Sequence, residues 1–260
     1  MRVALVQLAA GTDTEANTAA IRRLTKGVEA DLVVLPEAVM HDFGAPGLPL
    51  GPVAQPLDGP FVATLASVAR ATGAVVVAGM FERSGDPDRP YNTLVAVGRD
   101  GAVLATYRKA HLYDSFGYRE SDRLRAGDPV PAVLAVDGVR LGLLTCYDLR
   151  FPEQGRALVD AGADAFVVPA AWVRGPLKED HWQTLLRARA IENTVYVAAA
   201  AQNGRAYCGL SQLVDPLGVV VAGLGDDEGR LVAELDPDRV AAARERNPAL
   251  RHRRSWPSPS

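Results

Sequence analysis

The feature that most constrains this chain is a series of short apolar segments, most of them without a charged residue. They occupy residues 3–8, 32–35, 74–78, 93–97, 103–107, 139–145, 165–168, 195–200, 212–214, 219–222 and 231–235. Continuous apolar strands are usually buried on both faces, which requires helices or a second sheet as cover. The sequence therefore predicts strands at the centre of the fold, with other elements packed against them.

Segments with helical periodicity lie between the apolar runs, at residues 14–29, 59–71, 153–161, 178–192 and 237–246. Because helices and strands alternate and no change of composition marks a linker, we predict one α/β domain over residues 1–250 with mixed strand pairing. Residues 251–260 are polar and basic and contain proline. We expect this tail to be loose or to pack on a partner subunit.

Composition and charge argue against several classes of partner. The 260 residues include 28 basic and 31 acidic ones, with a formal net charge of −3, so nucleic acid and anionic membranes are poor candidates. No apolar run reaches the roughly 18 residues that a membrane-spanning helix needs. Residues 1–10 include Gln7 and lack a clear cleavage site, which favours a first strand over a signal peptide.

The cysteine and histidine content bears on compartment and metal binding. A large chain with only Cys146 and Cys208, and without a signal, is typical of the cytoplasm, where thiols stay reduced. We interpret Cys208 as a small residue in a packed strand. The histidines are neither paired nor clustered with cysteine, so we expect no metal site, and we expect no cofactor.

Cys146 stands where a predicted strand gives way to a predicted helix. The strand covers residues 139–145, and Pro152 is well placed as the first helical residue. A thiol at such a corner can face a cleft beside backbone N–H groups that lack a partner, which is how a nucleophile is presented. From this stretch alone, a small buried thiol is an equally good interpretation.

Two charged residues occupy comparable positions. Glu37 follows the apolar run 32–35, at the carboxyl end where open α/β sheets place their sites, although a solvated carboxylate in a turn explains Glu37 alone more simply. Lys109 follows the run 103–107 and is one of three lysines among the 28 basic residues. Its compact ammonium is a group that a planar guanidinium does not imitate.

Together, Glu37, Lys109 and Cys146 suit the hydrolysis of an amide. A nearby cation lowers the pKa of a thiol, and a carboxylate can take the thiol proton and return it to the departing nitrogen. The Lys109 ammonium and the Tyr147 backbone N–H are available to the oxyanion, and one such donor is worth about 3 kcal/mol. Water would then attack the thioester, with the carboxylate again as base.

Three blocks of sequence carry a resemblance to the nitrilase superfamily of carbon–nitrogen hydrolases. They are residues 35–37 (LPE), 107–112 (YRKAHL) and 144–153 (LTCYDLRFPE). Further similarity lies in residues 175–196 and 211–218, so the resemblance covers nearly the whole chain. Three ordered motifs in matching surroundings are a far stronger signal than a lone motif.

The resemblance implies a fold and a set of roles. The fold is a four-layer αββα sandwich with mixed sheets, and two chains pair as a homodimer. The roles implied are base for Glu37, oxyanion stabiliser for Lys109 and nucleophile for Cys146.

Glu120 takes the position of a second glutamate that follows the lysine block in this family. The resemblance implies that Glu120 orients Lys109 and the substrate amide. The alternative is a salt bridge with a nearby arginine, Arg119 or Arg123.

Two long loops, residues 41–56 and 111–130, interrupt the alternation of helices and strands. Long ordered loops in compact domains often form the rim of a site. Tyr118 lies in the second loop, and Trp172 follows the run 165–168. We therefore predict that Tyr118 and Trp172 contact the substrate, although packing under a loop is an alternative for Trp172.

The residues after Cys146 limit the range of candidate substrates. Cys-Tyr-Asp-x-Arg-Phe is similar to the omega-amidase and deaminated glutathione amidase branch, whereas carbamoylases and true nitrilases usually have tryptophan in place of Tyr147. Arg150 could bind a substrate carboxylate through two hydrogen bonds, unless it pairs with Asp148 or Glu153. We predict an amidase that converts a small carboxylate-bearing linear amide, the omega-amide of a 2-oxo acid or deaminated glutathione, to the acid and ammonia.

Other interpretations stay open at this point. An N-carbamoyl amide hydrolase or a nitrilase of the same superfamily would use the same residues. A Cys–His hydrolase would use His111 or His181 as its base. A non-catalytic scaffold would have no need to retain Glu37, Lys109 and Cys146 together.

Overall fold

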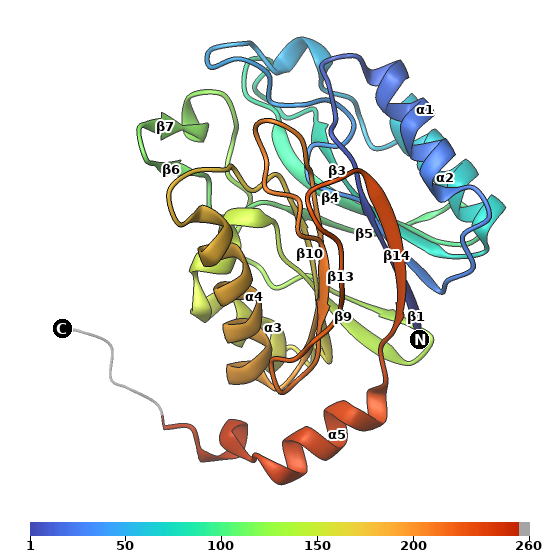
Figure 1. Cartoon of the computed structure of the whole chain (residues 1–260). Coiled ribbons are helices and arrows are strands. Elements are labelled where there is room, and N and C mark those ends of the chain that lie inside the picture. The colour runs from blue at the N-terminus through green and yellow to red at the C-terminus, as the bar shows by residue number, and fades with distance from the viewer. Residues whose placement is uncertain (255–260) are drawn as a thin grey trace.

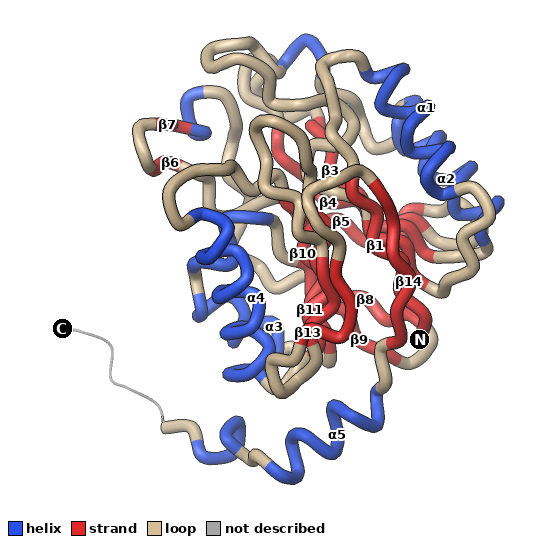
Figure 2. The backbone as a smooth tube through the Cα atoms, in the orientation of Figure 1, coloured by secondary structure: helices blue, strands red, loops and turns tan. Residues whose placement is uncertain are grey.

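The computed structural model describes residues 1–254, and most of their strands form two six-stranded sheets (Figure 1, Figure 2). The first sheet has the order β14 (Gly229–Glu234), β1 (Arg2–Gln7), β2 (Leu32–Val34), β3 (Val75–Glu82), β4 (Tyr91–Val97), β5 (Val103–Arg108). The second has the order β13 (Val220–Gly223), β12 (Gln212–Val214), β11 (Tyr196–Ala201), β10 (Ala165–Ala170), β9 (Val139–Leu143), β8 (Val133–Val136). A small hairpin pairs β6 (Asp114–Ser115) with β7 (Tyr118–Arg119).

Helices cover the outer face of each sheet. The α-helices are α1 (Thr14–Thr25), α2 (Pro60–Thr72), α3 (Pro152–Asp160), α4 (Lys178–Asn193) and α5 (Pro237–Arg246). The short 3-10 helices are η1 (Gly51–Val53), η2 (Glu120–Asp122), η3 (Cys146–Arg150) and η4 (Ala249–His252). Figure 1 shows α1 and α2 on one side of the sheets and α3 and α4 on the other.

The inner faces of the two sheets pack against each other. Val3 and Leu5 of β1 point into the core between the sheets, where they join Leu141 of β9. The alternate residues Ala4 and Val6 point the other way, into the core beneath α1 and α2. Because successive side chains of a strand face opposite sides, the central strands β1, β2 and β10 bury both faces. The strands β5 and β13 at the sheet edges are largely exposed, contrary to the sequence prediction. The predicted αββα sandwich with mixed sheets is confirmed.

Strands from both sheets end at the same edge of the sandwich. β2 and β3 are parallel, and β5 runs in the same direction because two antiparallel pairings link it to β3. In the other sheet, β9 and β10 are parallel. The residues that follow β2, β5, β9 and β10 are therefore brought together across the two sheets.

Some elements differ from the sequence prediction. Strands β6, β7 and β8 were not predicted. β8 and β9 are joined by the two residues Asp137 and Gly138, both with positive φ (46° and 83°), and an Asp-Gly pair between strands is a strong hairpin signal. Helix α1 ends at Thr25 rather than at residue 29, because the chain turns at Gly27, whose φ of 69° suits glycine.

Helix α5 lies at the opposite end of the sandwich from the β6–β7 hairpin (Figure 1). Arg244 of α5 bonds to Asp164, the residue before β10. Arg253 then pairs with Asp160 at the end of α3. The predicted tail 251–260 is described only as far as residue 254, and the rest of it lies outside the described residues.

Candidate active site

A cavity of about 550 Å³ opens where the ends of β2, β5, β9 and β10 converge. Its walls come from both sheets and from the loops that follow them. It is lined by every residue that the sequence assigned to the site: Glu37, Lys109, Glu120, Cys146, Tyr147, Arg150, Trp172 and Tyr118.

Lys109 lies between two buried glutamates. Its Nζ donates to Glu37 Oε1 at 3.0 Å and to Glu120 Oε2 at 2.9 Å, and all three side chains are at most 2% exposed. Burial opposes the charge of Lys109, but the charges of Glu120 and Glu37 outweigh it and hold the pKa of the ammonium well above its ordinary value. Lys109 is therefore a fixed cation directed by its two carboxylate partners.

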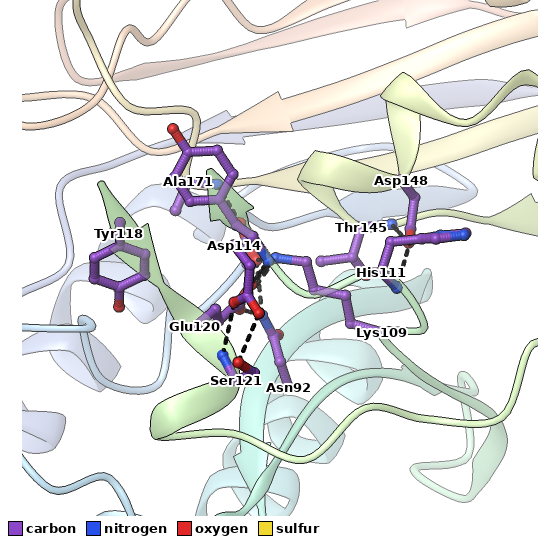
Figure 3. Close-up of polar contacts among 12 residues, drawn as sticks. Asn92, Lys109, His111, Asp114, Tyr118, Glu120, Ser121, Thr145, Asp148 and Ala171 are labelled. Atoms are coloured by element: carbon purple, nitrogen blue, oxygen red, sulfur yellow. Dashed lines mark hydrogen bonds and ion pairs between the residues drawn. The ribbon is translucent and has the colours of Figure 1, made fainter. Parts of the chain in front are cut away.

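Within residues 1–254, the Glu120 carboxylate forms no ion pair with Arg119 or Arg123, the arginines that the sequence offered as partners. Besides Lys109, its carboxylate accepts from the Tyr113 backbone N–H at 2.5 Å and from Asn92 Nδ2 at 3.3 Å. Burial raises the pKa of Glu120, and the charge of Lys109 lowers it only in part. Figure 3 shows Glu120, Lys109 and Asn92 directed toward one another.

Glu37 is oriented by donors that the sequence analysis did not identify. Asn92 Nδ2 donates to its Oε1 at 2.7 Å, and the Ala171 backbone N–H donates to its Oε2 at 2.6 Å. Gln202 Nε2 holds the Glu37 carbonyl at 2.9 Å. In the sequence, Asn92 stands directly before the apolar run 93–97. That position does not show that its amide is buried beside Glu37, as it is in the structure.

The turn that carries Glu37 passes very close to β3. A Cβ atom on Gly79 would lie 2.6 Å from Glu37 Cα and 2.6 Å from Ala38 N. Glycine is therefore required at this point of β3 for the turn to approach. Ala38 itself has a φ of 50°, an unusual value for a residue with a side chain.

Cys146 occupies a tight corner, as predicted. It follows β9 as the first residue of η3, and Pro152 is the first residue of α3. The φ of Cys146 is 45°, a sparsely populated backbone conformation that clusters at functional sites. Tyr147 comes next in η3, and the N–H groups of a first helical turn have no acceptor within the helix. The corner thus presents a thiol beside the Tyr147 N–H, which has no acceptor among residues 1–254.

The expected lowering of the thiol pKa was wrong for the free protein. Burial, followed by the charge of Glu37, raises the pKa of Cys146 well above its ordinary value, and the charge of Lys109 offsets this only in part. Burial thus favours the neutral thiol of Cys146 over the thiolate in the free protein.

A buried network lies behind the Cys146 corner. Asp148 is fully buried and accepts hydrogen bonds from the Thr145 backbone N–H and from Tyr107 Oη, both at 2.8 Å. His111 Nδ1 lies 2.8 Å from the same carboxylate (Figure 3). His111 and His181 are not among the residues that line the cavity, so the geometry does not support a Cys–His pair.

Arg150 does not make the salt bridges considered for it. Within residues 1–254 it forms no ion pair with Asp148 or Glu153, and its Nη2 instead lies 3.3 Å from His181 Nδ1. Its guanidinium stacks over the Trp172 ring, 5.1 Å from the centroid. Trp172 is both cavity wall and loop support, because its indole N–H donates to the Lys178 carbonyl at 2.7 Å.

Comparison with known proteins places this geometry in a family. The family model for carbon–nitrogen hydrolases matches residues 2–245. The chain belongs to the carbon–nitrogen hydrolase family. It is thus a hydrolase that acts on carbon–nitrogen bonds other than peptide bonds.

Individual relatives agree with this carbon–nitrogen hydrolase assignment. A deaminated glutathione amidase from Escherichia coli O157:H7 is 41% identical over 230 residues, which cover 88% of this chain and 87% of the relative. A CN-hydrolase superfamily protein from Xanthomonas campestris superposes with a TM-score of 0.89 at 30% identity, over 98% of both chains. Nit3 from Saccharomyces cerevisiae, a nitrilase superfamily member, gives a TM-score of 0.81 at 29% identity, over 95% of this chain and 94% of Nit3. The predicted resemblance is confirmed.

The sequence analysis missed several cavity residues of this carbon–nitrogen hydrolase. Tyr113 and Phe116 lie in the long loop that was expected at the rim, and Lys178 begins α4. A detectable signal for Lys178 was the scarcity of lysine, since two of the three lysines line this cavity.

Two further findings concern what the described residues do not contain. In residues 1–254, no group of three or more histidine, cysteine, aspartate or glutamate side chains is arranged to hold a metal ion. No helix of that same segment combines the length and apolar character needed to cross a membrane.

Proposed function

We propose that this carbon–nitrogen hydrolase is a cysteine-dependent amidase for a small carboxylate-bearing linear amide, through a thioester acyl-enzyme. The substrate class is the omega-amide of a 2-oxo acid or deaminated glutathione. The observation that carries the proposal is one cavity that holds Cys146, Glu37 and Lys109 together with Arg150, a cation without a carboxylate partner in residues 1–254. The name of the relative from E. coli supports the substrate class.

Acylation begins with proton transfer from Cys146, because burial favours the neutral form of its thiol. Glu37 takes the Cys146 proton as the sulfur attacks the amide carbon. The negative charge then moves to the carbonyl oxygen, where the Lys109 ammonium and the Tyr147 N–H stabilise it. Glu37 returns the proton to the nitrogen, the carbon–nitrogen bond breaks and the amine leaves.

Deacylation uses the same groups in the reverse sense. Glu37 removes a proton from a water molecule as the water oxygen attacks the thioester carbon. The oxyanion of the second tetrahedral intermediate again lies near Lys109. Collapse releases the acid, and the sulfur recovers a proton from Glu37. Glu120 holds Lys109 at 2.9 Å through both steps, so we assign it a positioning role.

The leaving group depends on the substrate. The sequence analysis expected ammonia from both substrates, but only the omega-amide of a 2-oxo acid releases ammonia. In deaminated glutathione the scissile amide joins the 2-oxo acid to cysteinylglycine, and the amine released is that dipeptide. 2-Oxoglutarate is therefore the product to measure, because 2-oxoglutaramate and deaminated glutathione both yield it.

The same proposal covers the cellular context. We propose a cytoplasmic homodimer whose catalytic domain comprises residues 1–250. Cys146 and Cys208 are both free, as expected where thiols stay reduced. Support for the homodimer comes from exposed apolar side chains around the contact of α4 with the 215–219 turn, where Ile191, Leu217 and Val219 are 45–55% exposed.

The test is a substrate panel with matched cysteine variants. 2-Oxoglutaramate, deaminated glutathione, an N-carbamoyl amino acid and a nitrile are compared in wild type, Cys146→Ala and Cys208→Ala. We expect wild type and Cys208→Ala to prefer the first two compounds and Cys146→Ala to lose turnover. Preference for the carbamoyl compound or the nitrile would contradict the substrate class. Equal turnover by wild type and Cys146→Ala would contradict the nucleophile.

A further inference from the structure

Two lysines line the cavity in opposite electrostatic settings. Lys109 is neutralised by two glutamates at about 3 Å. Lys178 is also buried, with 7% exposure, yet no carboxylate in residues 1–254 forms an ion pair with it. A buried charge without a partner is costly, so the lack of a carboxylate beside Lys178 in residues 1–254 requires an explanation.

Aromatic rings surround the Lys178 ammonium. Its Nζ lies 4.1 Å from the Phe116 ring centroid, 4.8 Å from Tyr113 and 5.7 Å from Trp172. It donates one hydrogen bond, to Tyr113 Oη at 2.9 Å. Ring faces attract a cation, but they leave the remaining ammonium protons without acceptors. The side chain is held in place while retaining free donors.

A second cation shares these rings. The Arg150 guanidinium lies 5.1 Å from the Trp172 ring centroid and 5.9 Å from Phe116. Its Nε is buried and has no hydrogen-bond partner among the described residues. Burial, followed by the charge of Arg150, lowers the pKa of Lys178, as expected for two like charges that no anion separates.

We propose that Lys178 and Arg150 form a two-cation subsite that binds the free carboxylate of the substrate. An anion between them would relieve their repulsion and satisfy both sets of donors, and both cations line the same cavity as Cys146. Lys178 is thus a specificity-determining residue that favours amides carrying a carboxylate over neutral amides. The inference rests on the proposed amidase function and names the residues that select its substrate.

The kinetic test compares two substrates in three proteins. 2-Oxoglutaramate carries the carboxylate, and pentanamide is a neutral amide of the same chain length. The proteins are wild type, Lys178→Met, which keeps the length and apolar stem, and Lys26→Met as a control for lysine loss at an exposed position. Thermal unfolding checks that each variant is folded.

We expect Lys178→Met to raise the KM for 2-oxoglutaramate by about 10- to 100-fold, the worth of one charge-assisted hydrogen bond. The kcat should stay within about threefold, because the change removes binding rather than chemistry. Pentanamide kinetics should be unchanged, and Lys26→Met should match wild type with both substrates. An equal change for both substrates, or no change for 2-oxoglutaramate, would overturn the subsite.

A binding measurement separates this inference from the amidase proposal. Calorimetric titration with glutarate, a dicarboxylate that cannot react, needs no turnover. Wild type should bind glutarate, and Lys178→Met should bind it at least about tenfold more weakly. If glutarate binds in this way while no amide is hydrolysed, the amidase proposal fails and the subsite stands. If wild type does not bind glutarate, or binds it no better than Lys178→Met, the subsite fails.

Discussion

The two sides of the cavity differ in origin and in charge. The strand side consists of Glu37, Lys109 and Cys146, which directly follow or closely follow β2, β5 and β9, and its charges are paired. The loop side consists of Tyr113, Phe116, Arg150, Trp172 and Lys178, and its two cations are unpaired in residues 1–254.

This difference suggests a division of labour. Charges that neutralise each other in a buried site stay in place without substrate, as preorganised electrostatic catalysis requires. Charges left without a partner select a ligand of the opposite sign. We therefore expect changes on the strand side to alter kcat for every amide and changes on the loop side to alter KM for charged amides only.

The largest expected effect is that of Glu37→Gln. The amide keeps the shape of the side chain but cannot take the thiol proton, so kcat should fall by about 10²- to 10⁴-fold. The loss should be equal for 2-oxoglutaramate and pentanamide, measured under saturating conditions with folding verified by circular dichroism. A loss of kcat for 2-oxoglutaramate alone would show that the strand side does not act on every amide, and would contradict the proposed difference between the two sides.

The next effect concerns the position of Glu37 rather than its chemistry. The new Cβ of Gly79→Ala would lie 2.6 Å from Glu37 Cα, so the turn must shift. We expect kcat to fall by about 10- to 100-fold for both substrates and unfolding free energy to fall by about 1–3 kcal/mol.

Gly85→Ala is the matched control, because nothing lies within 4 Å of a Cβ at that position. Steady-state kinetics and urea unfolding report both effects. Wild-type kinetics in Gly79→Ala would show that the close approach of β3 does not set the position of Glu37.

The smallest expected effect concerns the network behind the Cys146 corner. The hydrogen bond to Asp148 raises the pKa of His111, with burial opposing it. The stabilisation from protonated His111 is therefore complete below the unfolded pKa of about 6.5 and is lost as pH rises through the raised folded value.

Urea unfolding of wild type and His111→Gln at acidic and alkaline pH measures this contribution. The free energy of unfolding of wild type should exceed that of His111→Gln by about 1–2 kcal/mol near pH 6. This difference should shrink at alkaline pH. The exposed His252 supplies the control variant, His252→Gln. A difference that grows with pH would mean that the pair does not stabilise protonated His111.

The strand side could be predicted from the sequence because its geometry follows from strand ends. Apolar runs placed Glu37, Lys109 and Cys146 near the carboxyl ends of their strands, and the sandwich brings those ends together. The thiol pKa could not be predicted, because it depends on how completely the folded chain excludes water from Cys146. Asn92 was missed for a similar reason, since one polar residue in a strand does not show what it faces.

The loop side could be predicted only in outline. The second long loop was expected at the rim, and Tyr118 does line the cavity. The fold of that loop brings Phe116 against Lys178, about 60 residues away in sequence, and no periodicity encodes such a contact. Arg150 lines the cavity in the structure, and the sequence analysis did not identify Lys178 as a second cation near it.

The central claim is that Cys146 carries the acyl group during turnover. The most direct measurement is acid quenching of wild type during hydrolysis of 2-oxoglutaramate, followed by peptide mapping by mass spectrometry. The account predicts the acyl mass on the peptide that contains Cys146, removed by hydroxylamine as expected for a thioester. Continued formation of 2-oxoglutarate with the acyl group on another residue, or with none on Cys146, would contradict it.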